Sequence, residues 1–181
     1  MGLLEKYRRI FSVNNLVTDD HRIISLPLGI VDTAEKISFA TCRRHRDFSL
    51  WKTMIYCRNN FREYPRKVLY MNYRIPKNLK VRLESPKIAD GLDENLFTDR
   101  TKNTERWLLF DDRNSYVQYF KELLDHVFVQ CPSGFGIDSY RFYETLYLGR
   151  IPVVLKNPVT EMFHDLPVLF LDRWEDFGSE Y

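Results

Sequence analysis

The stretch HVFVQCPSGFGIDSYRFYETLYLGRIPVVL, residues 126–155, decides the fold. HVFVQC at 126–131 is a short apolar run that is typical of a buried strand, and IPVVL at 151–155 is a second one. Between them DSYRFYETLYLG shows helical spacing, with Asp138 predicted as the N-cap and Gly149 as the C-terminal cap. A strand, a helix and a strand with short links predict a right-handed crossover between two parallel strands.

The same alternation extends in both directions from this stretch. Downstream, PVTEMFHDL predicts a short helix, and PVLFLD at 167–172 predicts the last strand. Upstream, apolar spacing predicts a helix over 116–124, and short apolar runs predict strands at 67–73 and 23–28. An amphipathic helix with a basic outer face is expected within 34–66. The fold class is therefore α/β, a Rossmann-like parallel sheet flanked by helices.

Length and composition limit the class of protein. With 181 residues the chain fits one domain, expected over 21–181, after an N-terminal helix or linker over 1–20. A hydrophobic fraction of 44% excludes a disordered chain, and the net charge of +2 is too small to attract nucleic acid or an anionic membrane. No run reaches the roughly 18 to 20 apolar residues of a membrane span. Together with three cysteines, which form no disulfide framework, this predicts a cytoplasmic protein.

The loop PSGFGID at 132–138 is the expected ligand site, because ligands of open parallel sheets bind beyond the carboxyl ends of the strands. Gly134 and Gly136 allow the backbone to approach a ligand closely, and the helix that follows presents N–H groups suited to phosphate. Arg141 suits a diphosphate, and Glu144 suits ribose hydroxyls. Two alternatives remain open, an ordinary glycine turn and a surface ion pair between Arg141 and Glu144.

Other site chemistries fit the sequence less well. The dinucleotide fingerprint needs a third glycine, which is absent after Gly136, and no GK[ST] follows a glycine loop. Asp111 and Asp112 are adjacent and fit helix capping better than metal binding, so no bound metal is expected. The basic and aromatic block at 43–67 fits a solvated helix face better than a nucleic-acid surface, and no nucleic-acid partner is expected.

The run SGFGIDSYRFYETLYLGRIPVVLKNP at 133–158 resembles the C-terminal motif of exostosin-like glycosyltransferases. Upstream LPLGIVD and VLYMNY, and downstream PVLFLDRWEDF, follow in the order of that family, so the resemblance extends over about 21–177. The residues that carry the motif are Gly136, Asp138, Ser139, Arg141, Glu144, Gly149, Pro152 and Val153.

The resemblance implies the C-terminal, donor-binding lobe of a GT-B glycosyltransferase. By this likeness, Arg141 is expected at the donor phosphates, Glu144 at the ribose or nucleotide, and Ser139 at a further phosphate oxygen. Arg74 and Arg82 resemble the basic residues of the family that face the phosphates. The co-substrate would be a nucleoside-diphosphate sugar, with no cofactor and no metal. The expected donor-binding residues are Gly134, Gly136, Asp138, Ser139, Arg141, Glu144, Arg74 and Arg82.

The expected function is transfer of the sugar to a carbohydrate or glycoprotein acceptor, with no catalytic base assigned. Members of the family carry an N-terminal acceptor lobe that this sequence does not show, so a separate chain supplying it is an expected partner. The alternative is a non-catalytic or truncated transferase-like lobe that acts as a partner-binding module. A longer natural chain would shift the expected location to the Golgi or another membrane.

Overall fold

A five-stranded, all-parallel sheet forms the body of the protein, and the expected Rossmann-like α/β fold is confirmed. The computed structural model describes residues 6–13, 15, 19–30, 49–61, 64–73, 82–101, 113–134 and 136–179. The spatial order of the sheet is β4-β3-β5-β6-β7. Its strands are β3 (Lys67–Met71), β4 (Phe97–Asp99), β5 (His126–Gln130), β6 (Ile151–Leu155) and β7 (Leu169–Leu171).

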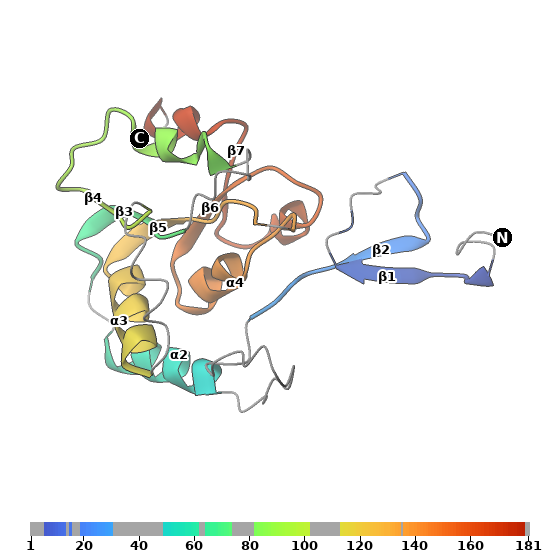
Figure 1. Ribbon diagram of the computed structural model, residues 1–181, viewed down its shortest axis with the longest axis horizontal. Helices are drawn as coiled ribbons and strands as arrows, with labels where there is room; N and C mark the ends of the chain where they lie inside the picture. Colours follow the sequence, from blue (N-terminus) through green and yellow to red (C-terminus); the bar gives the residue numbers. More distant parts are fainter. Residues whose placement is uncertain are drawn as a thin grey trace, which may run out of the picture.

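Helices cover both faces of the sheet (Figure 1). One face carries α2 (Ser49–Asn60), α3 (Arg113–Leu124) and α4 (Tyr140–Tyr147), with the 3-10 helix η4 (Thr160–Phe163) beside them. The other face carries two further 3-10 helices, η2 (Ser85–Ala89) and η5 (Trp174–Ser179), which pack on each other. Because both faces are covered, the central strands are nearly continuous apolar runs without polar alternation.

The order of the strands reverses between β3 and β5. Counted along the chain, the five strands lie in the order 2-1-3-4-5, so the connection that leaves β3 and the one that leaves β5 run in opposite directions. Leu69 of β3 pairs with Phe128 of β5, and both strands end at the same edge of the sheet. Open parallel sheets bind their ligands at such a switch point, which here lies between residues 72–73 and 131–134.

Helix α4 follows the switch point and ends at a glycine, as expected. Gly149 has a φ of 71° and donates its N–H to the Leu146 carbonyl oxygen at 3.0 Å. The N–H of Arg150 donates to the Thr145 carbonyl oxygen at 3.0 Å. These two hydrogen bonds form a Schellman motif, which requires the left-handed conformation that glycine adopts without strain.

The start of α4 differs by one residue from the expectation. The N-cap is Ser139, with extended backbone angles, and not Asp138. The Asp138 carboxylate instead accepts hydrogen bonds from the Leu28 N–H at 2.9 Å and from the Tyr143 hydroxyl. Asp138 therefore fastens segment 27–30 to α4, and this contact between distant parts of the chain displaces the local cap.

The N-terminal part of the chain forms a two-stranded parallel sheet of its own. Strand β1 (Ile10–Val13) pairs with β2 (Ile23–Leu26), and the pair lies apart from the body (Figure 1). A helix or linker was expected over 1–20, but β1 alternates half-buried and exposed side chains, which is the period of a strand. The expected strand at 23–28 is present, although it pairs with β1 and not with the main sheet.

Short elements account for the remaining differences. Strand β4 and the 3-10 helices η2 and η5 have six residues or fewer and were not predicted, because such lengths leave no readable periodicity. Asp111 and Asp112 lie outside the described residues. In the described parts of the chain, none of the helices combines the length and the apolar character that a membrane span requires.

Candidate functional site

The candidate site lies where the switch point meets the first turn of α4. We call it the switch-point site and define it by Arg82, Ser139, Arg141, Glu144 and the loop 131–134. Arg82 reaches it from the segment before η2, whereas Arg141 and Glu144 belong to α4. Arg74 lies outside the described residues, and Gly136 lies half-buried in the bend that leads to Asp138.

Three polar atoms at the start of α4 are buried and have no hydrogen-bond partner among the described residues. They are the Nε of Arg141, the Oγ of Ser139 and the Oδ1 of Asp138. Most buried polar atoms in folded proteins are paired, because an unpaired one loses its hydrogen bonds to water without replacement. Two unpartnered donors, one charged and one a hydroxyl, next to the N–H groups of a helix start are an arrangement suited to an anion.

Arg82 is held against the loop after β5. Its Nε donates to the Ser133 carbonyl oxygen at 2.8 Å, and its guanidinium lies 5.7 Å from the centre of the Tyr73 ring. Tyr73 is fully buried, and its hydroxyl donates to Oε1 of Gln130 at 2.8 Å. The side chain of Gln130 in turn donates to the Ser85 carbonyl oxygen at 2.7 Å. This chain of contacts fixes the position of Arg82 from both sides of the switch point.

Gly134 makes room for that arginine. A Cβ atom at this position would lie 3.2 Å from Nη2 of Arg82, closer than nearly all contacts of real Cβ atoms. Close backbone approach to a ligand was the expected role of Gly134. The structure provides a reason for glycine within the protein itself, because a side chain would displace the guanidinium.

The two arginines are close enough for their charges to interact. Burial and the positive charge of Arg141 lower the pKa of Arg82 to about 10. Burial acts to lower the pKa of Arg141, but the ionisable groups of Tyr119, Cys131 and Glu144 raise it above its ordinary value. Both guanidinium groups therefore remain charged at neutral pH, and their mutual repulsion favours an anion placed between them.

Glu144 is buried, with 6% of its surface exposed, and its Oε2 accepts a hydrogen bond from the Tyr119 hydroxyl at 2.8 Å. Burial raises the pKa of this carboxyl, although the bond from Tyr119 and the charge of Arg141 act in the opposite direction. Within the described chain no ion pair joins Arg141 and Glu144, so the surface pair considered from their spacing does not form.

Sequence reasoning missed Tyr73, Gln130 and Tyr119, which support the site. Tyr73 lies just after β3 at the edge where ligands bind, and this position is the one sequence signal that could have found it. Tyr119 could not be found in this way, because it faces Glu144 from another helix, 25 residues earlier. Cys131, the other titratable group nearby, is buried, and burial raises its pKa to about 12, so it is an inert thiol at neutral pH.

Among the described residues, no group of three His, Cys, Asp or Glu side chains is arranged to hold a metal ion.

Comparison with known families assigns the chain to a protein family. A family model described as RXYLT1 C-terminal domain matches residues 85–179, which is more than half of the chain and contains β4 to β7 together with α4. The chain belongs to this family. The RXYLT1 C-terminal domain is a member of the exostosin-like glycosyltransferases, so the resemblance seen in the sequence is confirmed. No curated protein matches the chain.

Within the RXYLT1 C-terminal domain match lie four of the five strands of the sheet and every described residue of the switch-point site except Arg82. Arg82 precedes the matched range by three residues. Most of the switch-point site thus lies within the matched range, and the chain is glycosyltransferase-like.

Proposed function

We propose that the chain binds a nucleoside-diphosphate sugar at the switch-point site and transfers the sugar to a carbohydrate or glycoprotein acceptor. The observation that carries the proposal is the buried, unpartnered Nε of Arg141 beside the unpartnered hydroxyl of Ser139. Membership of an exostosin-like glycosyltransferase family supports the class of reaction.

The diphosphate would occupy the space between the two arginines. Arg141 offers its Nε–H, which has no partner among the described residues, and Arg82, anchored through its own Nε, contributes the positive charge of its guanidinium. The Ser139 hydroxyl supplies a further donor, and the partial positive charge of the start of α4 adds to the attraction. Each of these groups favours phosphate over an uncharged ligand.

The ribose would lie against Glu144. One oxygen of this carboxylate is occupied by the Tyr119 hydroxyl, which leaves the other oxygen to accept a hydrogen bond from a sugar hydroxyl. Tyr119 therefore acts as a positioning residue that holds the carboxylate in one orientation.

In the transfer step, an acceptor hydroxyl oxygen attacks the anomeric carbon of the donor sugar. The bond from that carbon to the phosphate oxygen breaks, and the nucleoside diphosphate leaves with the bonding electrons. Arg141 and Arg82 would stabilise the negative charge that develops on the departing oxygen. The acceptor hydroxyl gives its proton to a general base, a role that we assign to none of the described residues.

Calorimetry with several nucleoside diphosphates tests the donor site. Wild-type protein should bind at least one of them, whereas Arg141→Gln should weaken binding roughly tenfold to a hundredfold through loss of a charge-assisted hydrogen bond. Glu144→Ala should weaken binding about tenfold. Arg66→Gln is the matched control, because Arg66 is exposed and precedes β3 at the opposite edge of the sheet. No heat signal with wild-type protein, or equal binding by all variants, would refute the proposal.

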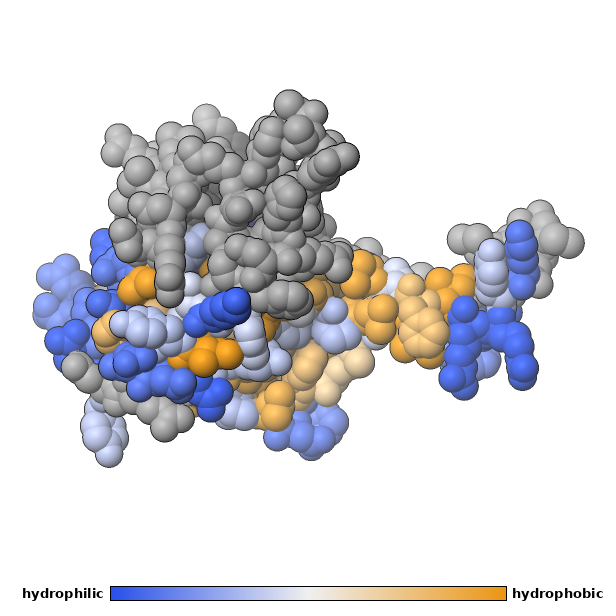
Figure 2. Space-filling view, turned by 90° about the horizontal axis from the view of Figure 1, so that it is seen from below, coloured by the Kyte–Doolittle hydropathy of each residue, from blue (hydrophilic) through white to orange (hydrophobic). Residues whose placement is uncertain are grey.

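The second candidate is a lobe that docks onto another polypeptide. Strands β1 and β2 form a parallel pair that has no further strand beside it among the described residues, and Phe11, Val13 and Leu26 expose 57%, 48% and 40% of their surfaces. Two-stranded sheets are marginal by themselves, and parallel sheets are normally covered on both faces. Figure 2 shows hydrophobic residues gathered where this pair joins the body and hydrophilic residues at its far end.

A polypeptide that adds a further parallel strand to β1 or β2 would complete this small sheet. Isolation of a stable heteromer, with sugar transfer only in the mixture, would favour this candidate over an enzyme that acts alone. Transfer by the single chain would exclude it.

A further inference from the structure

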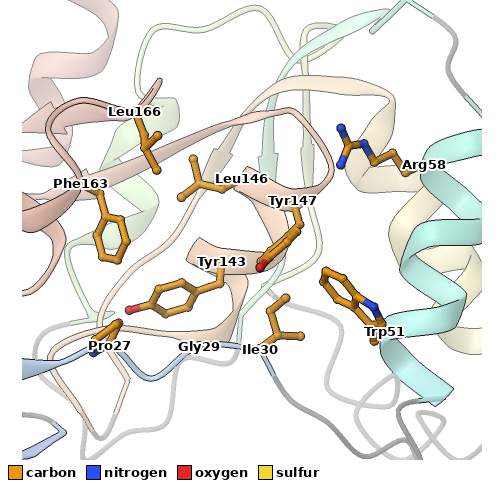
Figure 3. Close-up of a pocket in the computed structure, with 10 residues that line it drawn as sticks. All are labelled: Pro27, Gly29, Ile30, Trp51, Arg58, Tyr143, Leu146, Tyr147, Phe163 and Leu166. Carbon is orange, nitrogen blue, oxygen red and sulfur yellow. The ribbon is translucent and has the colours of Figure 1, made fainter.

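A hollow with a volume of about 650 Å³ lies on a different side of α4 from Arg141 and Glu144 (Figure 3). Its walls come from segment 27–30, from α2, from α4 and from residues 163–166 around the end of η4. None of Arg82, Arg141 and Glu144 lines it, so it is distinct from the switch-point site.

The walls are mainly aromatic and aliphatic. Trp51 of α2 meets Tyr147 of α4 edge to face, with the ring centres 4.7 Å apart, and Tyr143 meets Phe163 in the same way at 5.8 Å. The hydroxyl of Tyr143 donates to Asp138, so this tyrosine offers its ring to the hollow while its polar end is satisfied elsewhere. Leu146 extends the same apolar wall (Figure 3).

One charged side chain stands at the end of this apolar wall. Among the described residues that line the hollow, Arg58 is the only one that is charged. It is exposed in the last turn of α2 and makes no ion pair within the described part of the chain. Figure 3 shows its guanidinium at one end of the group of side chains, beyond Trp51 and Tyr147.

We propose that this hollow binds an acidic amphiphile, a molecule with an apolar body and one anionic head group. The apolar body would lie against Trp51, Leu146 and Tyr147, where it leaves water, and the head group would pair with Arg58. Sites of this size usually bury an apolar ligand and fix its orientation with a few polar groups. An uncharged lipid would leave Arg58 without a counter-charge, and free phosphate would make no use of the aromatic walls. The inference is independent of the proposed transferase activity.

Fluorescence of 1-anilinonaphthalene-8-sulfonate, an aromatic sulfonate, tests the proposal on the complete chain. The probe should bind and should be displaced by decanoate and by decyl phosphate at concentrations about fivefold lower than by 1-decanol, because only the first two pair with Arg58. Inorganic phosphate should not displace it. A preference for decanoate over decyl phosphate, or the reverse, would identify the head group as carboxylate or phosphate. Equal displacement by decanoate, decyl phosphate and 1-decanol would overturn the proposal.

Two variants and two controls complete the experiment. Arg58→Gln should remove the preference for the charged ligands, and Lys52→Gln, an exposed cation of the same helix outside the hollow, should keep it. Tyr147→Ser should weaken the binding of the probe and of all three decyl ligands severalfold. The protein should stay folded, because 45% of the surface of Tyr147 is exposed. Arg141→Gln should have no effect. Unchanged displacement in Arg58→Gln, or unchanged probe binding in Tyr147→Ser, would show that the ligands bind elsewhere and would overturn the proposal.

Discussion

The Nε–H of Arg141 is a buried donor that has no hydrogen-bond partner among the described residues, although the side chain as a whole is only half-buried. A buried donor without an acceptor typically costs about 1 to 3 kcal/mol, and a charged one costs more. An anionic ligand would remove that cost by supplying the acceptor. Glu144 differs from Arg141 in this respect, because its carboxylate already accepts a hydrogen bond from the Tyr119 hydroxyl.

Gly134→Ala tests whether the position of Arg82 matters for the proposed donor. The added methyl group would lie 3.2 Å from Nη2 of Arg82 and should displace the guanidinium by a few tenths of an ångström. We expect calorimetry to show about threefold to tenfold weaker nucleoside-diphosphate binding, with unfolding free energy changed by less than about 1 kcal/mol. Gly178→Ala is the control, since its new methyl group would have ordinary contacts at 3.8 Å. Unchanged affinity of Gly134→Ala for the nucleoside diphosphate would show that Arg82 does not contribute to its binding.

The raised pKa of Glu144 predicts a pH dependence of ligand binding. Burial raises this pKa above its ordinary 4.5, so the carboxyl takes up a proton at a higher pH than an ordinary glutamate. Because the ionised form is the better hydrogen-bond acceptor, affinity for a nucleoside diphosphate should fall as the pH is lowered through the raised pKa. Calorimetry from pH 8 downward, compared with Glu144→Gln, isolates this effect from titration of the ligand. Parallel pH profiles of the two proteins would contradict the proposed role.

At the scale of single elements, the end of α4 depends on one backbone conformation. Gly149 has a φ of 71°, and no atom of the described residues would lie within 4 Å of an added Cβ, so backbone strain is what opposes a side chain there. Gly149→Ala should lower the unfolding free energy by about 1 kcal/mol, as measured in urea. Gly178→Ala, which needs no left-handed conformation, should change it by less than about 0.5 kcal/mol. An equal loss in both variants would show that strain is not the cause.

The start of β5 carries a buried histidine that should make the sheet sensitive to acid. Nδ1 of His126 lies 2.6 Å from the backbone carbonyl oxygen of Glu122, and because a carbonyl oxygen can only accept, Nδ1 is the donor. Nε2 of the same ring faces the Thr98 hydroxyl at 2.9 Å. Lys67 donates to the same hydroxyl oxygen at 3.0 Å, so the neutral form of His126 fits its surroundings. Burial lowers its pKa below the ordinary 6.5.

Because the folded pKa of His126 is lower than the unfolded one, the unfolded chain binds more protons between the two values. The stability that the neutral ring contributes is complete above pH 6.5 and is lost as the pH falls below it, by at most about 1.4 kcal/mol per pH unit. Urea unfolding at several pH values should show a shallower acid loss in His126→Gln than in wild type. The exposed control His164→Gln should keep the wild-type slope. Identical slopes in all three proteins would show that His126 is not the cause.

The elements that could be predicted from the sequence are those with local causes. Strands β5, β6 and β7 are apolar runs between turn residues, and the end of α4 is set by Gly149, so each could be read from its own residues. The N-cap of α4 could not, because the Asp138 carboxylate contacts Leu28, 110 residues earlier in the chain. Contacts over such distances in sequence leave no trace in local spacing.

The candidate site divides in the same way. The motif correctly placed Arg141 and Glu144 on one helix beyond the carboxyl end of a strand, and their contacts with a donor stay predictions. The supporting pairs, Tyr119 with Glu144 and Tyr73 with Gln130, come from elements that meet only in the folded chain. Gly134 was expected to let a ligand approach the backbone, which stays a prediction. Only the packed structure shows that the absence of a side chain at Gly134 leaves room for Arg82.

At the scale of the whole molecule, the sheet collects these residues at one edge. The order β4-β3-β5-β6-β7 reverses between β3 and β5, so the chain leaves these two strands in opposite directions and opens a place for a ligand between them. The separate β1–β2 pair and the hollow beside Arg58 lie away from that edge. The described part of the molecule therefore offers three surfaces lined by different residues.

A crystal structure of the chain with a nucleoside diphosphate tests the central claim most directly. We expect a phosphate oxygen within hydrogen-bonding distance of Nε of Arg141, about 2.7 to 3.1 Å, with the ribose hydroxyls at Glu144. A nucleotide bound away from α4, or bound there with Nε of Arg141 still unpartnered, would contradict it.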